Sequence, residues 1–160
     1  MTRDVDYAAV VPAPVGLLGV RMRAGQLLAI DFAPRVTSVD KAPDGNLREV
    51  LDQLFHYFED PAWRFDLPLA VQGTPFQRRV WQALGRIPSG TTRSYGELAV
   101  ALCSSARAVG GACRRNPVPV VVPCHRVIAA GGAAGGFMGQ RDGEAVAIKT
   151  WLLNHERRDL

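Results

Sequence analysis

The chain has 160 residues, of which 48% are hydrophobic, so it is long enough to bury the core of one domain or of two small ones. No apolar run approaches the roughly 20 residues of a membrane span and the N-terminus lacks a signal-peptide pattern, so we expect a cytoplasmic protein without membrane contact. Three cysteines without metal-ligand spacing argue against a disulfide framework and a zinc site, and a formal net charge of +4 permits nucleic-acid binding without demanding it.

The first 72 residues predict a small α/β domain with an antiparallel-rich sheet and a helix. Apolar and polar residues alternate over 18–22 and again over 28–32, which predicts two half-buried strands in a hairpin. Apolar residues recur every three or four positions over 46–58, as in an amphipathic helix, and alternation over 65–71 predicts another strand. Because no catalytic groups gather in residues 1–72, we interpret them as a scaffold.

Residues 73–160 predict a second, mostly α-helical domain. The Thr-Pro-Phe-Gln sequence at 74–77 is a capping box that starts a helix. Ser94 begins another capping box, whose helix covers 95–102, and a serine at 104 or 105 caps a third helix that ends at Asn116, before a proline. Two short helices joined by so few residues have the form of a helix-turn-helix.

The third predicted helix combines arginines with residues that have almost no side chain. Arg107, Gly111 and either Arg114 or Arg115 share one face by the three-and-four rule. Each glycine costs about 1 kcal/mol of helix stability relative to alanine, so its presence suggests that something approaches the backbone closely. That partner could be DNA, or the glycines could serve tight packing between helices.

A thiol and an imidazole follow this helix in the sequence Pro-Cys-His-Arg. The β-branched run 120–122 predicts a short strand that ends at Cys124. His125 could take the thiol proton, directly or through one water, and Arg126 adds positive charge. Because neighbours in a strand point to opposite faces, a turn or a bridging water would be needed. The alternative is that Cys124 is a buried small hydrophobe and His125 an ordinary surface residue.

Pro-Cys-His-Arg-Val, preceded by Arg-Ala-Val-Gly-x-Ala and Asn-Pro-Val-Pro, resembles the O6-alkylguanine-DNA alkyltransferases. The resemblance extends over 73–156. It implies a ribonuclease-H-like N-terminal domain and a helix-turn-helix that enters the minor groove of double-stranded DNA. It also implies repair by irreversible, single-turnover transfer of an alkyl group from a flipped O6-alkylguanine to a cysteine, in a monomer without metal or cofactor. Whether O4-alkylthymine is also a substrate stays open.

The resemblance assigns roles to individual residues. Cys124 becomes the nucleophile, and the Lys-x-x-Leu-Leu-x-x-Glu pattern over 149–156 makes Glu156 the carboxylate that orients His125. The hinge asparagine becomes Asn116, and Tyr95 rotates the adjacent phosphate and bonds the flipped guanine. Contacts to DNA are expected from Tyr95, Ser94, Arg107 and Arg114. Of these, Arg107 fills the space left by the flipped nucleotide.

The same resemblance places a base pocket around four residues: Pro119, Val127, Phe137 and Met138. The glycine-rich loop 131–139 would close one wall, and without a lysine at its end it is not a phosphate loop. The chain departs from the family pattern at Phe137, where tyrosine is usual, at Met138, where a small or hydroxyl residue is usual, and at Gln140. Extra residues over 141–146 precede the last helix. The preferred size of the alkyl group therefore stays open.

Two other functions fit parts of this pattern. A non-catalytic DNA-binding relative could recognise lesions without reacting with them, although such proteins lack the reactive cysteine that Cys124 supplies. A cysteine hydrolase could use Cys124 and His125 on an ester or amide, although no oxyanion-hole arrangement is recognisable. The remaining thiols, Cys103 and Cys113, are expected to be buried and structural.

Overall fold

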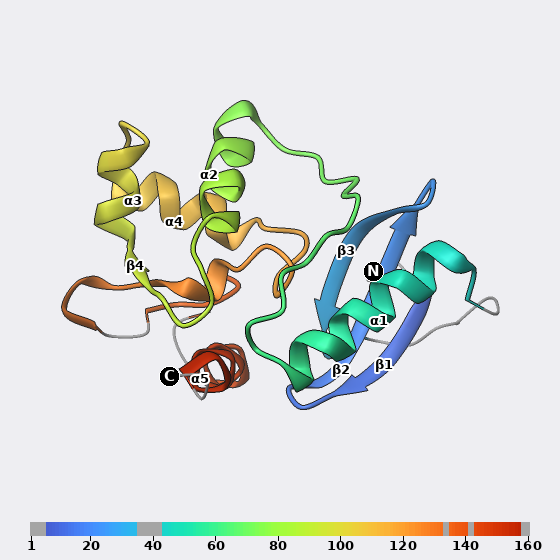
Figure 1. The fold of residues 1–160 in the computed structure, drawn as a ribbon. Coiled ribbons are helices and arrows are strands. Elements are labelled where there is room, and N and C mark those ends of the chain that lie inside the picture. Colours follow the sequence, from blue (N-terminus) through green and yellow to red (C-terminus); the bar gives the residue numbers. More distant parts are fainter. Residues whose placement is uncertain (1–5, 35–42, 133–134, 141–142, 158–160) are drawn as a thin grey trace. The chain divides into compact units, whose positions relative to one another are not determined.

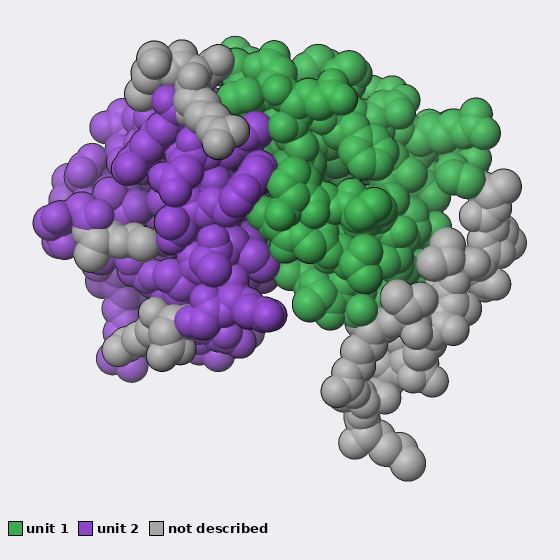
Figure 2. Space-filling view, turned by 90° about the horizontal axis from the view of Figure 1, so that it is seen from below, with its two compact units in different colours: residues 1–72 green, residues 73–160 purple. Residues whose placement is uncertain are grey.

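The structure is a computed structural model that describes residues 6–34, 43–132, 135–140 and 143–157. The chain forms two compact units, Met1–Gln72 and Gly73–Leu160, which Figure 2 shows in different colours. Among the described residues, no helix has both the length and the apolar character that crossing a membrane requires.

The N-terminal unit is a three-stranded antiparallel sheet with one helix (Figure 1). Its strands are β1 (Ala9–Ala13), β2 (Gly16–Arg23) and β3 (Gln26–Phe32), in the order β1-β2-β3, and its helix is α1 (Gly45–Glu59). The predicted hairpin and helix are confirmed. Strand β1 was not predicted, because its sequence Ala-Val-Val-Pro-Ala does not alternate; its proline is tolerated at the edge of the sheet.

Helix α1 buries a stripe that differs from the expected one: Gln53 and Tyr57 are buried, whereas Phe55, which the three-and-four spacing placed in the stripe, is not. Leu54 and Tyr57 are almost fully buried, whereas Phe55 is 44% exposed. The spacing of three residues from Leu54 to Tyr57 keeps both on the same face, and Phe55 lies beside that face. Asp44 caps the helix by accepting a hydrogen bond from the Leu47 N–H.

The predicted strand over 65–71 is wrong: the segment is extended, with a single parallel bridge between Leu27 and Leu69. The Leu27 N–H donates to the Pro68 carbonyl over 2.9 Å, and the Ala70 N–H donates to the Leu27 carbonyl over 2.8 Å. Pro68 has no N–H to donate, which limits the pairing that a ladder needs.

The C-terminal unit is mostly helical (Figure 1). Its elements are α2 (Pro75–Gly85), β4 (Arg93–Ser94), α3 (Tyr95–Ala101), α4 (Ala106–Arg114), the 3₁₀ turn η1 (Cys124–Arg126), β5 (Val127–Ile128), the 3₁₀ turn η2 (Ala130–Gly132) and α5 (Glu144–Arg157). The three predicted caps are confirmed. Thr74 and Gln77 form a complete capping box, Ser94 caps α3, and Ser105 caps α4.

Two contacts fix the helices around the Pro-Cys-His-Arg segment. The indole N–H of Trp81, on α2, donates to the Ala112 carbonyl near the end of α4 over 2.9 Å. Strands β4 and β5 pair in parallel, with Ser94 opposite Ile128. This pairing, which the sequence did not predict, holds the beginning of α3 next to the residues that follow Cys124.

The run over 120–122 is a turn and not the predicted strand. The Val122 N–H donates to the Val118 carbonyl over 2.9 Å, and Val120 has a φ of +74°. A β-branched residue adopts positive φ only where its surroundings determine it, so this turn is strained. Cys124 therefore begins the turn η1 and does not end a strand.

The last helix begins earlier than the sequence indicates. Of the residues over 141–146 expected to precede it, those from Glu144 onward already belong to α5. Arg141 and Asp142 lie outside the described residues, as do Ala133 and Ala134 of the glycine-rich loop.

Candidate active site

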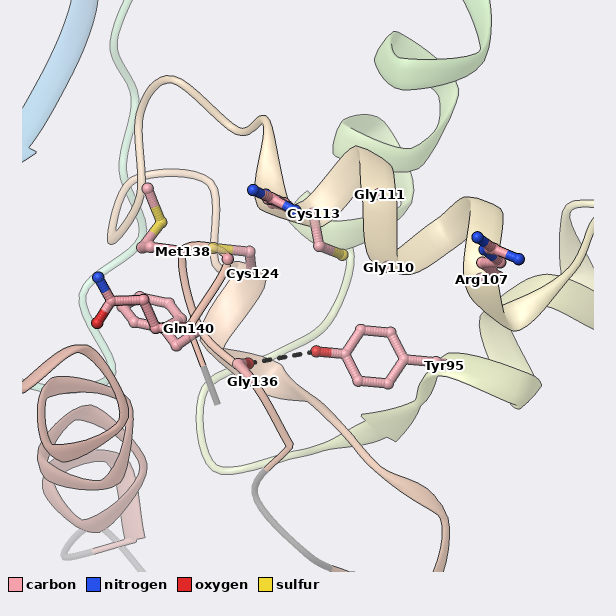
Figure 3. A pocket seen from close by; sticks show the side chains of 12 residues that line it. Tyr95, Arg107, Gly110, Gly111, Cys113, Cys124, Gly136, Met138 and Gln140 are labelled. Atoms are coloured by element: carbon pink, nitrogen blue, oxygen red, sulfur yellow. Dashed lines mark hydrogen bonds between the residues drawn. The ribbon is translucent and has the colours of Figure 1, made fainter. Parts of the chain in front are cut away.

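A cavity of about 390 Å³ lies between α3, α4, η1 and the segment over 136–140 (Figure 3). Its size is in the range of small-molecule sites in proteins. The lining residues are Tyr95, Arg107, Gly110, Gly111, Cys113, Arg114, Cys124, Gly136, Phe137, Met138, Gly139 and Gln140. Cys124 is only 4% exposed, yet it lines this cavity, so a group inside the cavity can reach it.

Behind Cys124, the imidazole of His125 is turned toward the last helix. His125 Nε2 and Glu156 Oε2 are 2.8 Å apart, and both side chains are buried. Arg126 donates to the same carboxylate from Nε and Nη2, and its Nη1 donates to the Ile87 carbonyl over 2.6 Å. The sequence indicated only that Arg126 adds positive charge; its pairing with Glu156 was not predicted.

The hydrogen bonds determine the protonation of this pair. Burial acts to raise the pKa of Glu156, but the hydrogen bonds from His125 and Arg126 outweigh it and hold the pKa at about 2. The carboxylate is therefore ionised and only accepts, so His125 Nε2 carries the proton that it donates. Burial lowers the pKa of His125, and its Nδ1 is buried with no hydrogen-bond partner among the described residues. His125 is thus a neutral imidazole with Nδ1 as its basic atom.

The strained turn before Cys124 is held by Asn116. Its Nδ2 donates to the Val122 carbonyl over 2.8 Å, and its Oδ1 accepts from the Val118 N–H over 3.0 Å. Asn116 is 2% exposed, so these bonds satisfy an amide that would otherwise be buried without partners. One side chain closes both ends of the turn that leads to Cys124.

Cys124 is a protonated thiol at neutral pH. Burial raises its pKa to about 11, although a hydrogen bond from Asn116 and the positive charge of Lys149 act in the opposite direction. Burial also raises the pKa of Cys113 to about 12. Since the thiolate is the nucleophile, chemistry at Cys124 requires a base nearby.

Lys149, on α5, has a buried amine in this site, which the sequence revealed only through the Lys-x-x-Leu-Leu-x-x-Glu pattern. Its Nζ donates to the Val127 carbonyl over 2.6 Å and to the Gly136 carbonyl over 3.0 Å. It also lies 5.7 Å from the centre of the Tyr95 ring. Burial lowers the pKa of Lys149, and a negative charge on Cys124 or Cys113, which either carries only as a thiolate, acts in the opposite direction. Lys149 therefore joins the segment after Cys124 to the cavity wall.

Tyr95 forms another part of the wall. Its hydroxyl donates to the Gly136 carbonyl over 3.5 Å, as the dashed line in Figure 3 marks. Burial raises its pKa to about 12, and the negative charge of Cys113 or Cys124 in the thiolate form adds to this effect. Tyr95 is therefore a neutral phenol whose hydroxyl can donate a hydrogen bond to a group in the cavity.

The structure brings most of the sequence-predicted site residues together, but not all of them. Tyr95, Arg107, Arg114, Phe137 and Met138 line the cavity with Cys124. Pro119 and Val127 are buried and are not among the lining residues, and the Ser94 hydroxyl accepts a hydrogen bond from the Glu97 N–H. Of the other thiols, Cys113 is buried as expected and lines the cavity, whereas Cys103 is exposed, so that expectation was wrong.

Comparison with known proteins identifies relatives over nearly the whole chain. Residues 75–158 match the family of 6-O-methylguanine DNA methyltransferase, DNA binding domain. The constitutive methylated-DNA–protein-cysteine methyltransferase of Bacillus subtilis is 45% identical over 130 residues, which cover 80% of this chain and 76% of the relative. That of Mycolicibacterium paratuberculosis is 41% identical over 161 residues, 96% of this chain and 93% of the relative. The crystal structure of Mycobacterium tuberculosis OGT in complex with DNA has a TM-score of 0.79 and 37% identity, and covers 93% of this chain and 91% of that one.

Proposed function

Because this chain belongs to the methylated-DNA–protein-cysteine methyltransferase family and repairs DNA by alkyl transfer, we propose that Cys124 is the cysteine that accepts the alkyl group. The observation that carries this assignment is the position of Cys124. It lines the cavity from η1 and is followed in the sequence by a neutral imidazole, to which an ionised carboxylate is hydrogen-bonded. Cys113 lines the same cavity but has no such base beside it in the sequence.

In the proposed reaction, His125 Nδ1 takes the proton of the Cys124 thiol, directly or through one water, while Glu156 holds the imidazole by its Nε2–H. The sulfur attacks the alkyl carbon in line with its bond to guanine O6. A carbon–sulfur bond forms, the carbon–O6 bond breaks, and the electron pair stays on the guanine. Tyr95 helps to neutralise the departing guanine by a hydrogen bond from its neutral hydroxyl.

The product explains why the reaction occurs once per protein molecule. A thioether does not readily hydrolyse, so Cys124 stays alkylated and turnover stops at one. Sulfur is a suitable acceptor because its thiolate is strongly nucleophilic. The proposed chemistry needs no metal or cofactor, because the protein supplies both the base and the acceptor.

We assign DNA binding to the α3–α4 pair, as a helix-turn-helix that enters the minor groove of double-stranded DNA. The glycines of α4 support this. A methyl group at Gly111 would meet no atom within 4 Å, and one at Gly110 would make only ordinary contact with Tyr95 at 3.9 Å. The protein's own packing therefore does not require glycine at either position. Close approach of a DNA backbone would require glycine there, and a narrow groove favours small residues.

The remaining residues have roles that follow from their places on this pair. In the proposal, Arg107 enters the duplex where the damaged nucleotide has left it, and Arg114 and Ser94 contact the DNA backbone. Extrusion is needed because O6 of a paired guanine cannot reach a buried thiol. We further propose that the N-terminal unit has the ribonuclease-H-like fold, and that the protein acts as a monomer in the cytoplasm.

Intact mass spectrometry tests the assignment. After mixing with duplex DNA that contains one O6-methylguanine, the protein should gain one methyl group per molecule, and peptide mapping should locate it on Cys124. Cys124→Ala should bind the DNA without gaining mass, and Cys103→Ala, which changes an exposed thiol, should react like wild type. Binding without transfer by the wild-type protein would indicate lesion recognition alone, and repeated turnover of an ester would indicate a hydrolase.

A further inference from the structure

One wall of the cavity is a tight turn over 137–140. The Phe137 N–H donates to the Gln140 carbonyl over 2.8 Å, and the Gln140 N–H donates back over 3.0 Å. The two residues between them have positive φ, +51° at Met138 and +82° at Gly139. Two successive left-handed residues characterise a type I′ turn, which favours asparagine or glycine at the first of them. Because Met138 is neither, the turn depends on contacts from elsewhere to keep its geometry.

Arg114, the last residue of α4, supplies such a contact. A Cβ atom at Gly139 would lie 2.7 Å from Nε, 3.2 Å from Cζ and 3.3 Å from Cδ of Arg114. The arginine side chain therefore lies directly against the backbone of the turn, where a side chain on residue 139 would project. Arg114, Met138 and Gly139 all line the cavity together with Cys124. The contact thus borders the space that an alkyl group would occupy.

We propose that Arg114 fastens the turn over 137–140 and so determines the size of the alkyl group that the cavity accepts. This inference rests on the proposed alkyl transfer to Cys124 and adds a specificity role to the DNA contact assigned to Arg114. Met138 is unbranched and adapts its shape readily, so the position of the turn, more than the side chain, limits the cavity. When the arginine is removed, the turn can move outward. The rate constant for transfer of a bulky alkyl group should then increase more than that for a methyl group.

The test compares O6-benzylguanine with O6-methylguanine as free nucleobases. Because these substrates carry no phosphate, the charge that is lost with Arg114 does not change the result through weaker DNA binding. The measured quantity is the ratio of their second-order rate constants for alkylation of the protein. In Arg114→Ala the benzyl-to-methyl ratio should rise about fivefold or more, within the range by which pocket contacts discriminate between substrates. If the wild-type protein does not react with the free bases, the same two groups are compared in a short duplex at saturating protein.

Two matched variants separate packing from charge. Arg115→Ala removes the same charge from the adjacent residue, which is exposed like Arg114 but does not line the cavity, and should leave the ratio unchanged. Arg114→Met keeps an unbranched stem that reaches the position of Nε, so it should return the ratio toward the wild-type value although its DNA affinity stays reduced. An equal ratio in Arg114→Ala and Arg115→Ala would overturn the inference.

A double-mutant cycle tests the contact itself. Gly139→Ala places a methyl group against Arg114, so it should slow alkylation more in the wild-type background than in the Arg114→Ala background, where only the strain of positive φ remains. Equal slowing in both backgrounds would show that the two residues are not coupled. If the wild-type protein takes no alkyl group from either DNA or base, the proposed function fails; if it reacts but the ratio and the cycle show no effect, only this inference fails.

Discussion

Arg126 holds the carboxylate of Glu156 by its two short hydrogen bonds, from Nε to Oε1 over 2.8 Å and from Nη2 to Oε2 over 2.9 Å, and Nε also donates to Oε2 over 3.3 Å. Oε2 also accepts the hydrogen bond from His125 Nε2 over 2.8 Å. Because the guanidinium neutralises much of the charge on Glu156, the carboxylate orients the imidazole without keeping it protonated. This agrees with the lowered pKa of His125. A neutral imidazole can accept the thiol proton, and an imidazolium could not.

The first prediction concerns Arg126 as a positioning residue. Arg126→Lys keeps the charge but cannot make two parallel hydrogen bonds to one carboxylate. Glu156 should then hold His125 less firmly, and we expect the single-turnover rate constant at saturating DNA to fall about tenfold or more. The expected fall is smaller than the loss of a whole general base would cause, because His125 itself is still present. DNA affinity should not change. Arg115→Lys, at an exposed position, is the control; a loss of affinity with an unchanged rate in Arg126→Lys would contradict the prediction.

The second prediction is the pH dependence of stability. The pKa of His125 is lowered by burial, so below its ordinary value of 6.5 the unfolded chain binds a proton that the folded protein excludes, and stability falls as the pH drops. Glu156 has its pKa lowered from 4.5 to about 2, so its contribution is complete above pH 4.5 and is lost as the pH falls toward 2. The urea midpoint, measured from pH 8 to pH 3, should decline in both ranges.

Two histidine variants check this assignment. His125→Gln should remove the decline near pH 6.5, because the group that titrates in the unfolded chain is gone. His56→Gln changes an exposed histidine that stacks on Trp63 and should leave the profile as it is. A profile that depends on His56 and not on His125 would refute the explanation.

Local signals in the sequence were sufficient to predict the helices and three of their caps, but not Asp44, which caps α1. Thr74, Ser94 and Ser105 each accept the hydrogen bond that a capping serine or threonine is expected to accept, because a cap involves only residues three positions apart. The turn over 120–122 could not be predicted in the same way. Its valines favour a strand, and the hydrogen bonds that impose positive φ on Val120 come from Asn116, whose role as a turn anchor no local periodicity reveals.

The site was predictable where one short motif contains it and unpredictable where distant segments meet. Cys124 and His125 are adjacent in sequence, whereas Lys149 reaches two carbonyls, at Val127 and Gly136, from a helix that comes later in the chain. Composition gives no sign of such a contact. The resemblance to a family pointed to Glu156, but nothing in the sequence indicated that Arg126 shares its carboxylate.

The third prediction concerns Asn116. Asn116→Ala removes both hydrogen bonds of a buried amide and leaves the Val118 N–H without its partner, while the Val122 carbonyl still accepts from the Cys124 N–H. The loss should destabilise the protein by about 1–3 kcal/mol. Because the strained Val120 loses its support, the thiol should also lose its fixed position, and alkyl transfer should slow. Chemical denaturation and single-turnover kinetics measure the two effects. Asn46→Ala, at an exposed helix position, is the control and should change neither.

The last prediction separates stability from DNA binding at Gly111. Gly111→Ala should raise the free energy of unfolding by up to about 1 kcal/mol, because alanine favours the helix and the added methyl meets no atom of the protein. The same methyl should weaken binding to duplex DNA if α4 enters the groove with its backbone close to the DNA. Gly85→Ala is the matched control: it lies at the end of α2, a methyl there also meets nothing within 4 Å, and it should change stability without changing DNA affinity. Opposite signs of the two effects at Gly111, together with unaltered affinity at Gly85, would indicate that the glycine serves the partner and not the fold. Unchanged DNA affinity in Gly111→Ala would mean that α4 does not approach DNA at this residue, and the assignment of the groove-binding face would have to be abandoned.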